Sequence, residues 1–221
     1  MALDRERWTN LWNRLGLEGP PEPLLAKLRR SHGQWWRAYH GAAHVMDCLV
    51  RLDEIPETLE SDPSILDRDL LEMAFWFHDA IYVPWLPKNE ERSARWAVKA
   101  LSRAGLPTDR VRRVEELILA TRHIGPDSDV AETEATVDAV WMVDIDLSIL
   151  GASRERFDRY ERQIRQEYRW VGASRYRAGR RAVLDGFLSR PSIYGTDTFR
   201  RRFEVSAKEN LRRALADLGP V

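Results

Sequence analysis

A small set of imidazole and carboxylate side chains in otherwise apolar segments could carry chemistry. The chain contains five histidines, and one of them, His78, is followed directly by Asp79. The pair comes straight after an apolar run at 74–77. A buried His–Asp pair requires a proton, an arginine or a metal ion to offset the cost of burying its charge. Imidazole and carboxylate groups are also a common ligand set for Mn, Fe, Co, Ni and Zn. The pair therefore predicts a divalent metal site.

Other residues of the same types could complete this site. His44 lies one helical turn after His40, so the two share a helix face. Asp144 and Asp146 alternate with apolar residues. The candidates to complete the site are His44, Asp146 or Asp144, and His123.

Each of these residues also has a purely structural interpretation. A single histidine on an apolar helix face usually has a hydrogen-bond partner in the core. The later aspartates could accept hydrogen bonds from the backbone or pair with arginines, and Asp79 could cap the end of its helix. The residues would then form a buried polar network in a helical protein without a metal.

The elements that position these residues are predicted to be helices. Apolar residues recur at spacings of three and four throughout, with no sustained alternation typical of strands. Capping residues, glycines and prolines delimit the segments. The chain shows no repeat and no long linker, so we expect one all-α domain covering 1–221. The predicted helices cover residues 4–15, 24–30, 40–52, 64–80, 90–104, 108–123, 137–150, 153–170, 176–189 and 198–218.

Composition narrows the class of protein and of partner. The 35 basic and 35 acidic residues balance, so no overall attraction to nucleic acid or to an acidic membrane is expected. No apolar run reaches the roughly 20 residues of a membrane helix, and the first residues do not resemble a secretory signal. Cys48 is the single cysteine, which excludes an internal disulfide and a thiolate zinc cluster. We expect a cytoplasmic protein.

The order of the candidate ligands resembles the HD-domain superfamily, which comprises metal-dependent phosphohydrolases with an H…HD…D signature. The resemblance covers residues 39–151 and is strongest to a bacterial subgroup of predicted HD-superfamily phosphohydrolases. It implies an HD-domain-like helical bundle with a metal-binding core at 39–151 and helical extensions at both ends. The segments that carry it are Tyr39-His-Gly-Ala-Ala-His44, Trp76-Phe-His-Asp-Ala-Ile-Tyr82, Asn89-Glu-Glu-Arg-Ser-Ala94, Ala120-Thr-Arg-His123 and Asp144-Ile-Asp-Leu-Ser-Ile-Leu-Gly151.

The resemblance assigns roles residue by residue. It implies that His44, His78, Asp79 and Asp146 bind one divalent ion, with Asp144 as the alternative to Asp146. Mn, Co, Ni, Fe, Mg and Zn all remain open as the metal. The implied catalytic residues are Asp79, Glu90 and His123, and the implied substrate-binding residues are His40, Lys88, Arg92 and Arg122. Lys88, Glu90 and Arg92 could equally form a solvated first helical turn.

The implied activity is hydrolysis of a phosphate ester by metal-activated water, with nucleotides among the candidate substrates. The alternative is a non-catalytic HD-fold module that binds a nucleotide or a metal. We expect a small phosphorylated partner and a homodimer as one candidate assembly, with no nucleic acid and no membrane.

Overall fold

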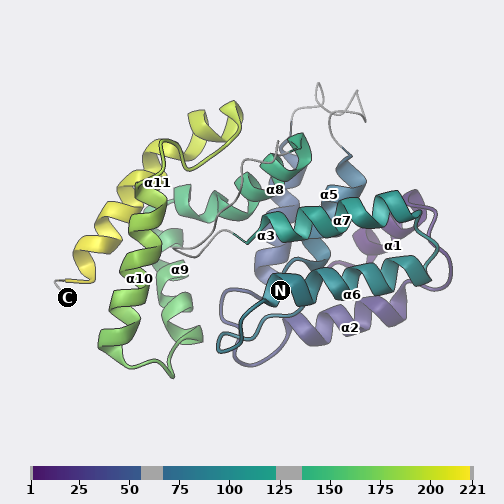
Figure 1. Cartoon of the computed structure of the whole chain (residues 1–221), viewed down its shortest axis with the longest axis horizontal. Helices are drawn as coiled ribbons and strands as arrows, with labels where there is room; N and C mark the ends of the chain where they lie inside the picture. The colour runs from purple at the N-terminus through teal and green to yellow at the C-terminus, as the bar shows by residue number, and fades with distance from the viewer. Residues whose placement is uncertain (1, 56–66, 123–135, 220–221) are drawn as a thin grey trace. The chain divides into compact units, whose positions relative to one another are not determined.

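The computed structural model describes residues 2–55, 67–122 and 136–219 and is helical throughout them (Figure 1). Within these ranges no residue is assigned to a strand, which confirms the all-α prediction. None of the described helices combines the length and the apolar character needed to cross a membrane. The described residues form two compact units: 2–55, 67–122 and 136–142 make up the first, and 143–219 make up the second. The expected core at 39–151 therefore includes parts of both units.

The first unit contains the segments predicted around the histidines. Its helices are α1 (Arg5–Arg14), α2 (Glu22–His32), α3 (Ala42–Asp53), α5 (Arg68–Phe77), α6 (Asn89–Arg103) and α7 (Thr108–Ala120). Helix α8 (Val137–Asp146) begins in this unit and ends in the second. Helices α6 and α7 pack side by side, and α5 packs against α3, α6 and α7. Helix α5 is therefore the central element of this unit.

Helix α1 shows how the local sequence sets an element. The Asp4 carboxylate accepts hydrogen bonds from the amides of Glu6 and Arg7, which caps the helix at its predicted start. Trp8 and Trp12 are buried on the predicted apolar face. The Trp8 ring packs edge-on against Trp76 of α5, with centroids 5.0 Å apart. The two helices therefore share an aromatic core.

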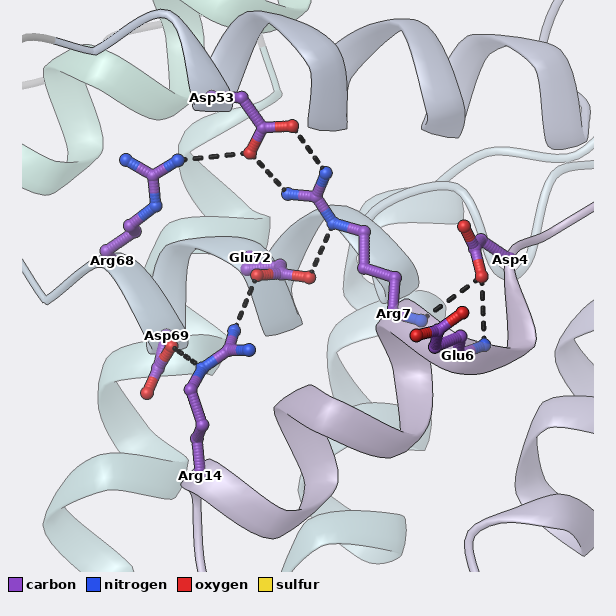
Figure 2. A network of polar contacts seen from close by, with 8 residues as sticks. All are labelled: Asp4, Glu6, Arg7, Arg14, Asp53, Arg68, Asp69 and Glu72. Atoms are coloured by element: carbon purple, nitrogen blue, oxygen red, sulfur yellow. Dashed lines mark hydrogen bonds and ion pairs between the residues drawn. The ribbon is translucent and has the colours of Figure 1, made fainter.

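A network of ion pairs fastens α1 to α5 beside this core (Figure 2). Glu72 of α5 is 3% exposed and accepts from Arg7 Nε at 2.8 Å and from Arg14 Nη2 at 2.9 Å. Arg7 also forms a bidentate pair with Asp53 at the end of α3, and Arg14 bonds Asp69. The network lines an open cavity of about 450 Å³. Because each of the two arginines bonds two carboxylates, we interpret the network as a structural clamp.

Helix α5 is almost completely buried and ends three residues earlier than predicted. All residues from Leu70 to Phe77 are buried. The prediction placed the end of the helix at Ala80, whereas the regular helix stops at Phe77 and the Ala80 amide donates to the Phe77 carbonyl in a turn. Part of the predicted start, residues 64–66, lies outside the described ranges. The earlier end places His78 and Asp79 at the carboxyl terminus of the central helix.

The second unit contains η1 (Leu147–Gly151), α9 (Arg154–Glu167), α10 (Ala173–Leu188) and α11 (Asp197–Asp217). The predicted helix through Leu150 changes to a 3-10 helix at Leu147. This segment packs on α11, where a Cβ at Gly151 would lie 2.6 Å from Phe203 Cβ. Only glycine permits that approach. The Tyr194 hydroxyl also donates to the Leu147 carbonyl at 3.2 Å.

Candidate metal centre

The carboxyl end of α5 presents His78 and Asp79 as consecutive residues. The amide of His78 still donates to the Ala74 carbonyl at 2.8 Å, so His78 is the last residue held by the helix. The end of an α-helix carries a partial negative charge and favours a nearby cation. His44 comes from the first turn of α3, where its amide donates to the Gly41 carbonyl at 3.1 Å. Two helices therefore bring these side chains together.

Three ligand-type atoms of the first unit form a tight triangle. His44 Nε2 and His78 Nε2 are 3.1 Å apart. Asp79 Oδ2 is 3.3 Å from His78 Nε2 and 3.6 Å from His44 Nε2. Both imidazoles are buried, and the Asp79 side chain is 13% exposed. The structure thus brings together the three candidate ligands that belong to this unit.

The hydrogen bond on the far side of His78 fixes which nitrogen faces the triangle. His78 Nδ1 lies 3.0 Å from the Phe75 carbonyl, which can only accept. In the neutral ring, Nδ1 therefore carries the proton and Nε2 presents its lone pair to the other two atoms. A metal-binding histidine is oriented in this way by a carbonyl in many sites. The Nε2 lone pair of His78 is therefore available to bind a cation.

The triangle requires a positive charge at its centre. Asp79 Oδ2 is fully enclosed yet accepts no hydrogen bond from the described residues. Burial alone would raise the pKa of Asp79, but the imidazoles of His78, His40 and His44 lower it below its ordinary value. Two cations suit this arrangement: a proton on His44 Nε2, or a divalent metal ion. At metal–ligand distances of about 2.0–2.2 Å, neighbouring donors lie roughly 2.8–3.6 Å apart for octahedral to tetrahedral angles, so the observed spacing is compatible with a metal.

A thiol that the sequence analysis did not assign to the site lies beside it. Cys48 is buried one turn after His44 on α3, and its Sγ is 3.7 Å from His44 Nδ1. The ligand-type atoms of His44, Cys48 and His78 all lie within 4.8 Å of one another. The spacing of four residues between His44 and Cys48 is the sequence signal that could have indicated this contact. The thiol can orient the His44 ring or act as an additional soft donor.

Arg37 holds the two ligand-bearing segments together. Its guanidinium donates to the carbonyls of Asp79 at 2.5 Å and Ala80 at 3.2 Å, just after α5, and to the His40 carbonyl at 2.9 Å, just before α3. It also bonds Gln34 Oε1 at 3.0 Å. A guanidinium can make all these contacts because its donors form a rigid planar fork. No sequence motif singles out Arg37, because its partners are backbone carbonyls distant in the sequence.

His32 is a third buried imidazole, close enough to Arg37 to feel its charge. His32 is 3% exposed, its Nε2 lies 3.4 Å from the Trp76 carbonyl, and its Nδ1 has no hydrogen-bond partner in the described part of the chain. Burial, together with the nearby charge of Arg37, lowers the pKa of His32 to about 3. His32 is therefore neutral at physiological pH and acts as a core residue.

His40, predicted to bind substrate, lies next to the triangle without being part of it. Its ring stacks on Tyr82 with centroids 4.1 Å apart and meets His44 edge-on at 6.0 Å. His40 is partly exposed, unlike the two ligand histidines. Tyr82 is also covered by Arg37, whose Cζ is 5.6 Å from the ring centroid. The position suits a donor to a ligand bound at the triangle.

The remaining predicted substrate-binding and catalytic residues lie around the start of α6 or outside the described ranges. Lys88 is exposed in the left-handed region, with φ of 63°, directly before the helix, and Glu90 and Arg92 occupy its first turn. Arg122, which follows α7, pairs with Glu91 of α6 at 3.2 Å. His123 lies outside the described residues. The structure leaves the roles of these residues as predictions.

The two later aspartates belong to the second unit and have different surroundings. Asp144 is fully buried and accepts from the amides of Gly195 and Thr196, each at 2.7 Å, and from Thr196 Oγ1 at 2.6 Å. Burial raises the pKa of Asp144 despite these bonds. Asp146 is partly exposed at the end of α8. The Asp144 carboxylate is therefore already used inside its own unit.

Comparisons of the chain with protein-family models, with curated proteins and with solved structures gave no match.

Proposed function

We propose that this protein is a metal-dependent hydrolase of phosphate esters, as the resemblance to HD-domain proteins implies. The observation that carries the proposal is the convergence of His44 Nε2, His78 Nε2 and the unsatisfied Asp79 Oδ2 within 3.6 Å. A metal ion bound there would lower the pKa of a coordinated water and neutralise charge on a phosphate oxygen. Such a cluster would not stabilise a purely apolar core, because burying polar groups without partners costs free energy.

We further propose Asp146 rather than Asp144 as the later carboxylate ligand. Asp144 already accepts three short hydrogen bonds from residues 195–196, and giving these up would leave buried donors unpaired. This argument supports the order His44, His78-Asp79, Asp146. The metal identity stays open among Mn, Co, Ni, Fe, Mg and Zn, because imidazole and carboxylate donors suit most of these ions.

The side chains around the triangle would contribute in distinct ways. His40 would donate a hydrogen bond to a phosphate oxygen, since its ring lies beside His44 and is partly exposed. Glu90 and His123 are proposed to move the proton between water and leaving group, and Lys88, Arg92 and Arg122 to balance phosphate charge. Nucleotides are the first substrates to test. The second candidate function is a metal- or nucleotide-binding module without turnover.

Turnover of a panel of phosphate monoesters and nucleotides, with each candidate metal in turn, tests the proposal. We expect Asp79→Asn, His78→Gln and Asp146→Asn each to lower the rate by at least about 100-fold, more than the loss of an outer-shell partner. Asp109→Asn is the matched control, because this carboxylate is exposed at the start of α7. Metal binding without turnover would favour the binding module. An active Asp146→Asn beside an inactive, folded Asp144→Asn would reverse the choice of ligand.

A further inference from the structure

The hairpin of α9 and α10 carries a concentration of positive charge that the neutral overall composition hides. Residues 162–181 contain seven arginines and a single acidic residue, Glu167. Five of these arginines lie toward the turn between the two helices, and together with three aromatic residues we call them the basic tip (α9 and α10 in Figure 1). The basic tip comprises Arg162, Arg165, Arg169, Arg175 and Arg177 with Tyr168, Trp170 and Tyr176.

The charge of the basic tip is accessible. Arg162, Arg169, Arg175 and Arg177 are all exposed. Arg162, Arg175 and Arg177 form no ion pair within the described part of the chain. Arg165 donates to the carbonyls of Tyr168 and Val171, which are neutral, so its charge also remains. A positive surface of this kind attracts a polyanion.

The acidic residues of α9 closest to the basic tip leave most of this charge in place. Glu167, which is 2% exposed, is the single acidic residue among the five arginines of the tip. Glu161 is paired with the buried Arg180, and Asp158 with Arg213 of α11. These ion pairs stabilise the helix packing of the second unit. The two carboxylates are therefore already paired with arginines outside the basic tip.

The basic tip also carries one exposed aromatic ring, Trp170, and two partly exposed ones, Tyr168 and Tyr176, which a merely solvated charged surface does not need. Trp170 is 53% exposed and lies nearly parallel to Tyr168, with an interplanar angle of 29° and centroids 6.3 Å apart. The Arg165 guanidinium covers the Tyr176 ring, with Cζ 4.5 Å from its centroid. Exposed aromatic rings among arginines provide stacking platforms for unpaired bases, while the guanidinium groups contact phosphates.

We propose that the basic tip binds single-stranded nucleic acid, with Arg175 and Arg177 contacting phosphates and Trp170 stacking on a base. This inference does not rest on the proposed metal centre, because none of the residues of the basic tip belongs to that site. It also revises the expectation of no nucleic-acid partner, because that expectation relied on charge averaged over the whole chain. An anionic membrane would also be attracted to the positive charge, but it offers no base for Trp170 to stack on.

Binding is tested with the full chain and a labelled oligothymidylate of about 20 nucleotides, followed by fluorescence anisotropy between about 50 and 200 mM salt. We expect Arg175→Ala/Arg177→Ala to weaken binding and to make the slope of log K against log salt shallower by about 1.4, at about 0.7 for each lost phosphate contact on single strands. Trp170→Ala should weaken binding about 10-fold, while Trp170→Phe should keep most of the affinity because a ring remains.

Arg95→Ala/Arg103→Ala is the matched control, since it removes two exposed arginines from α6 of the first unit and the same net charge. It should leave affinity within about twofold. The proposal is overturned if no binding occurs, if the control pair weakens binding as much as the tip pair, or if Trp170→Ala has no effect. Binding to vesicles of anionic lipid without binding to the oligonucleotide would assign the basic tip to membranes and equally overturn it.

Discussion

The Asp79→Asn variant tests whether the triangle of His44, His78 and Asp79 binds a metal ion or only stabilises the fold. In the metal-free protein the buried Asp79 Oδ2 accepts no hydrogen bond from the described residues. Replacing this oxygen by an amide therefore removes no hydrogen bond from it, and we expect the variant to fold without metal and to keep most of its free energy of unfolding. The variant should nevertheless lose most of its response to added metal, because one of the three converging donors has lost its charge.

The size of that response follows from linkage between binding and folding. At a free metal concentration of about 100 times Kd, the folded state gains about 2.7 kcal/mol. For a chain of this length, each kcal/mol raises Tm by about 2–4 °C, so the wild type should gain about 5–11 °C. If the substitution weakens binding about 100-fold, the same metal concentration equals the new Kd and supplies only about 0.4 kcal/mol, or about 1 °C.

The assay is thermal unfolding of chelator-treated protein titrated with each candidate metal, with Asp109→Asn as a control that keeps the full response. A wild type whose Tm is unaffected by every candidate ion would refute the metal site. So would an Asp79→Asn variant with the wild-type response. A variant that is strongly destabilised without metal would instead show that Asp79 stabilises the fold through a protonated histidine.

Three further predictions concern other residues of the first unit. Arg37→Lys should lower metal affinity about 10–100-fold in a calorimetric titration, because an ammonium cannot hold the carbonyls of both ligand-bearing segments as the guanidinium does. Glu72→Gln should lower the free energy of unfolding in urea by about 2–3 kcal/mol, since two arginines lose a buried partner, whereas Asp69→Asn, at the more exposed edge of the clamp, should cost less than about 1 kcal/mol. His32, with a pKa of about 3 when folded and an ordinary value when unfolded, binds fewer protons in the folded state between those values. The wild type should therefore lose stability relative to His32→Gln as the pH falls from about 6.5 toward 3, and the difference should be constant above about pH 7; a difference that does not vary with pH would contradict this account.

The helical class and most helices could be predicted from apolar spacing and caps, and the boundaries that differ coincide with contacts between residues distant in the sequence. Helix α5 stops before Asp79 because the carbonyls of Asp79 and Ala80 bond the Arg37 guanidinium in place of later helical amides. Helix α8 gives way to a 3-10 helix at Leu147, where Gly151 approaches Phe203 on α11. Both causes are contacts with residues distant in the sequence, which periodicity does not register.

The candidate site was predictable where residue type and order carried the information. His44, His78 and Asp79 could be selected because polar ligands in apolar helices are uncommon, and the structure brings them together. The role of Arg37 could not be selected, because an arginine in a loop is unremarkable until its neighbours are known, whereas Cys48 had one signal, its spacing of four residues from His44. A contact through a backbone carbonyl leaves no trace in the partner's residue type.

Hydrogen-bond partners distinguish the carboxylates that the sequence presents as equivalent. Glu72 and Asp138 are nearly fully buried, and each is neutralised by arginine, in the latter case Arg113 at 2.8 Å. Asp144 is satisfied by backbone amides and a hydroxyl. These three carboxylates find their partners within the protein, so replacing any of them should lower the stability of the fold. Asp79 instead directs an enclosed, unbonded oxygen at two imidazole nitrogens, one of which must present a lone pair in its neutral form. Because an unsatisfied buried carboxylate is costly in a folded protein, its persistence next to two such nitrogens is best explained by a cation that all three groups share.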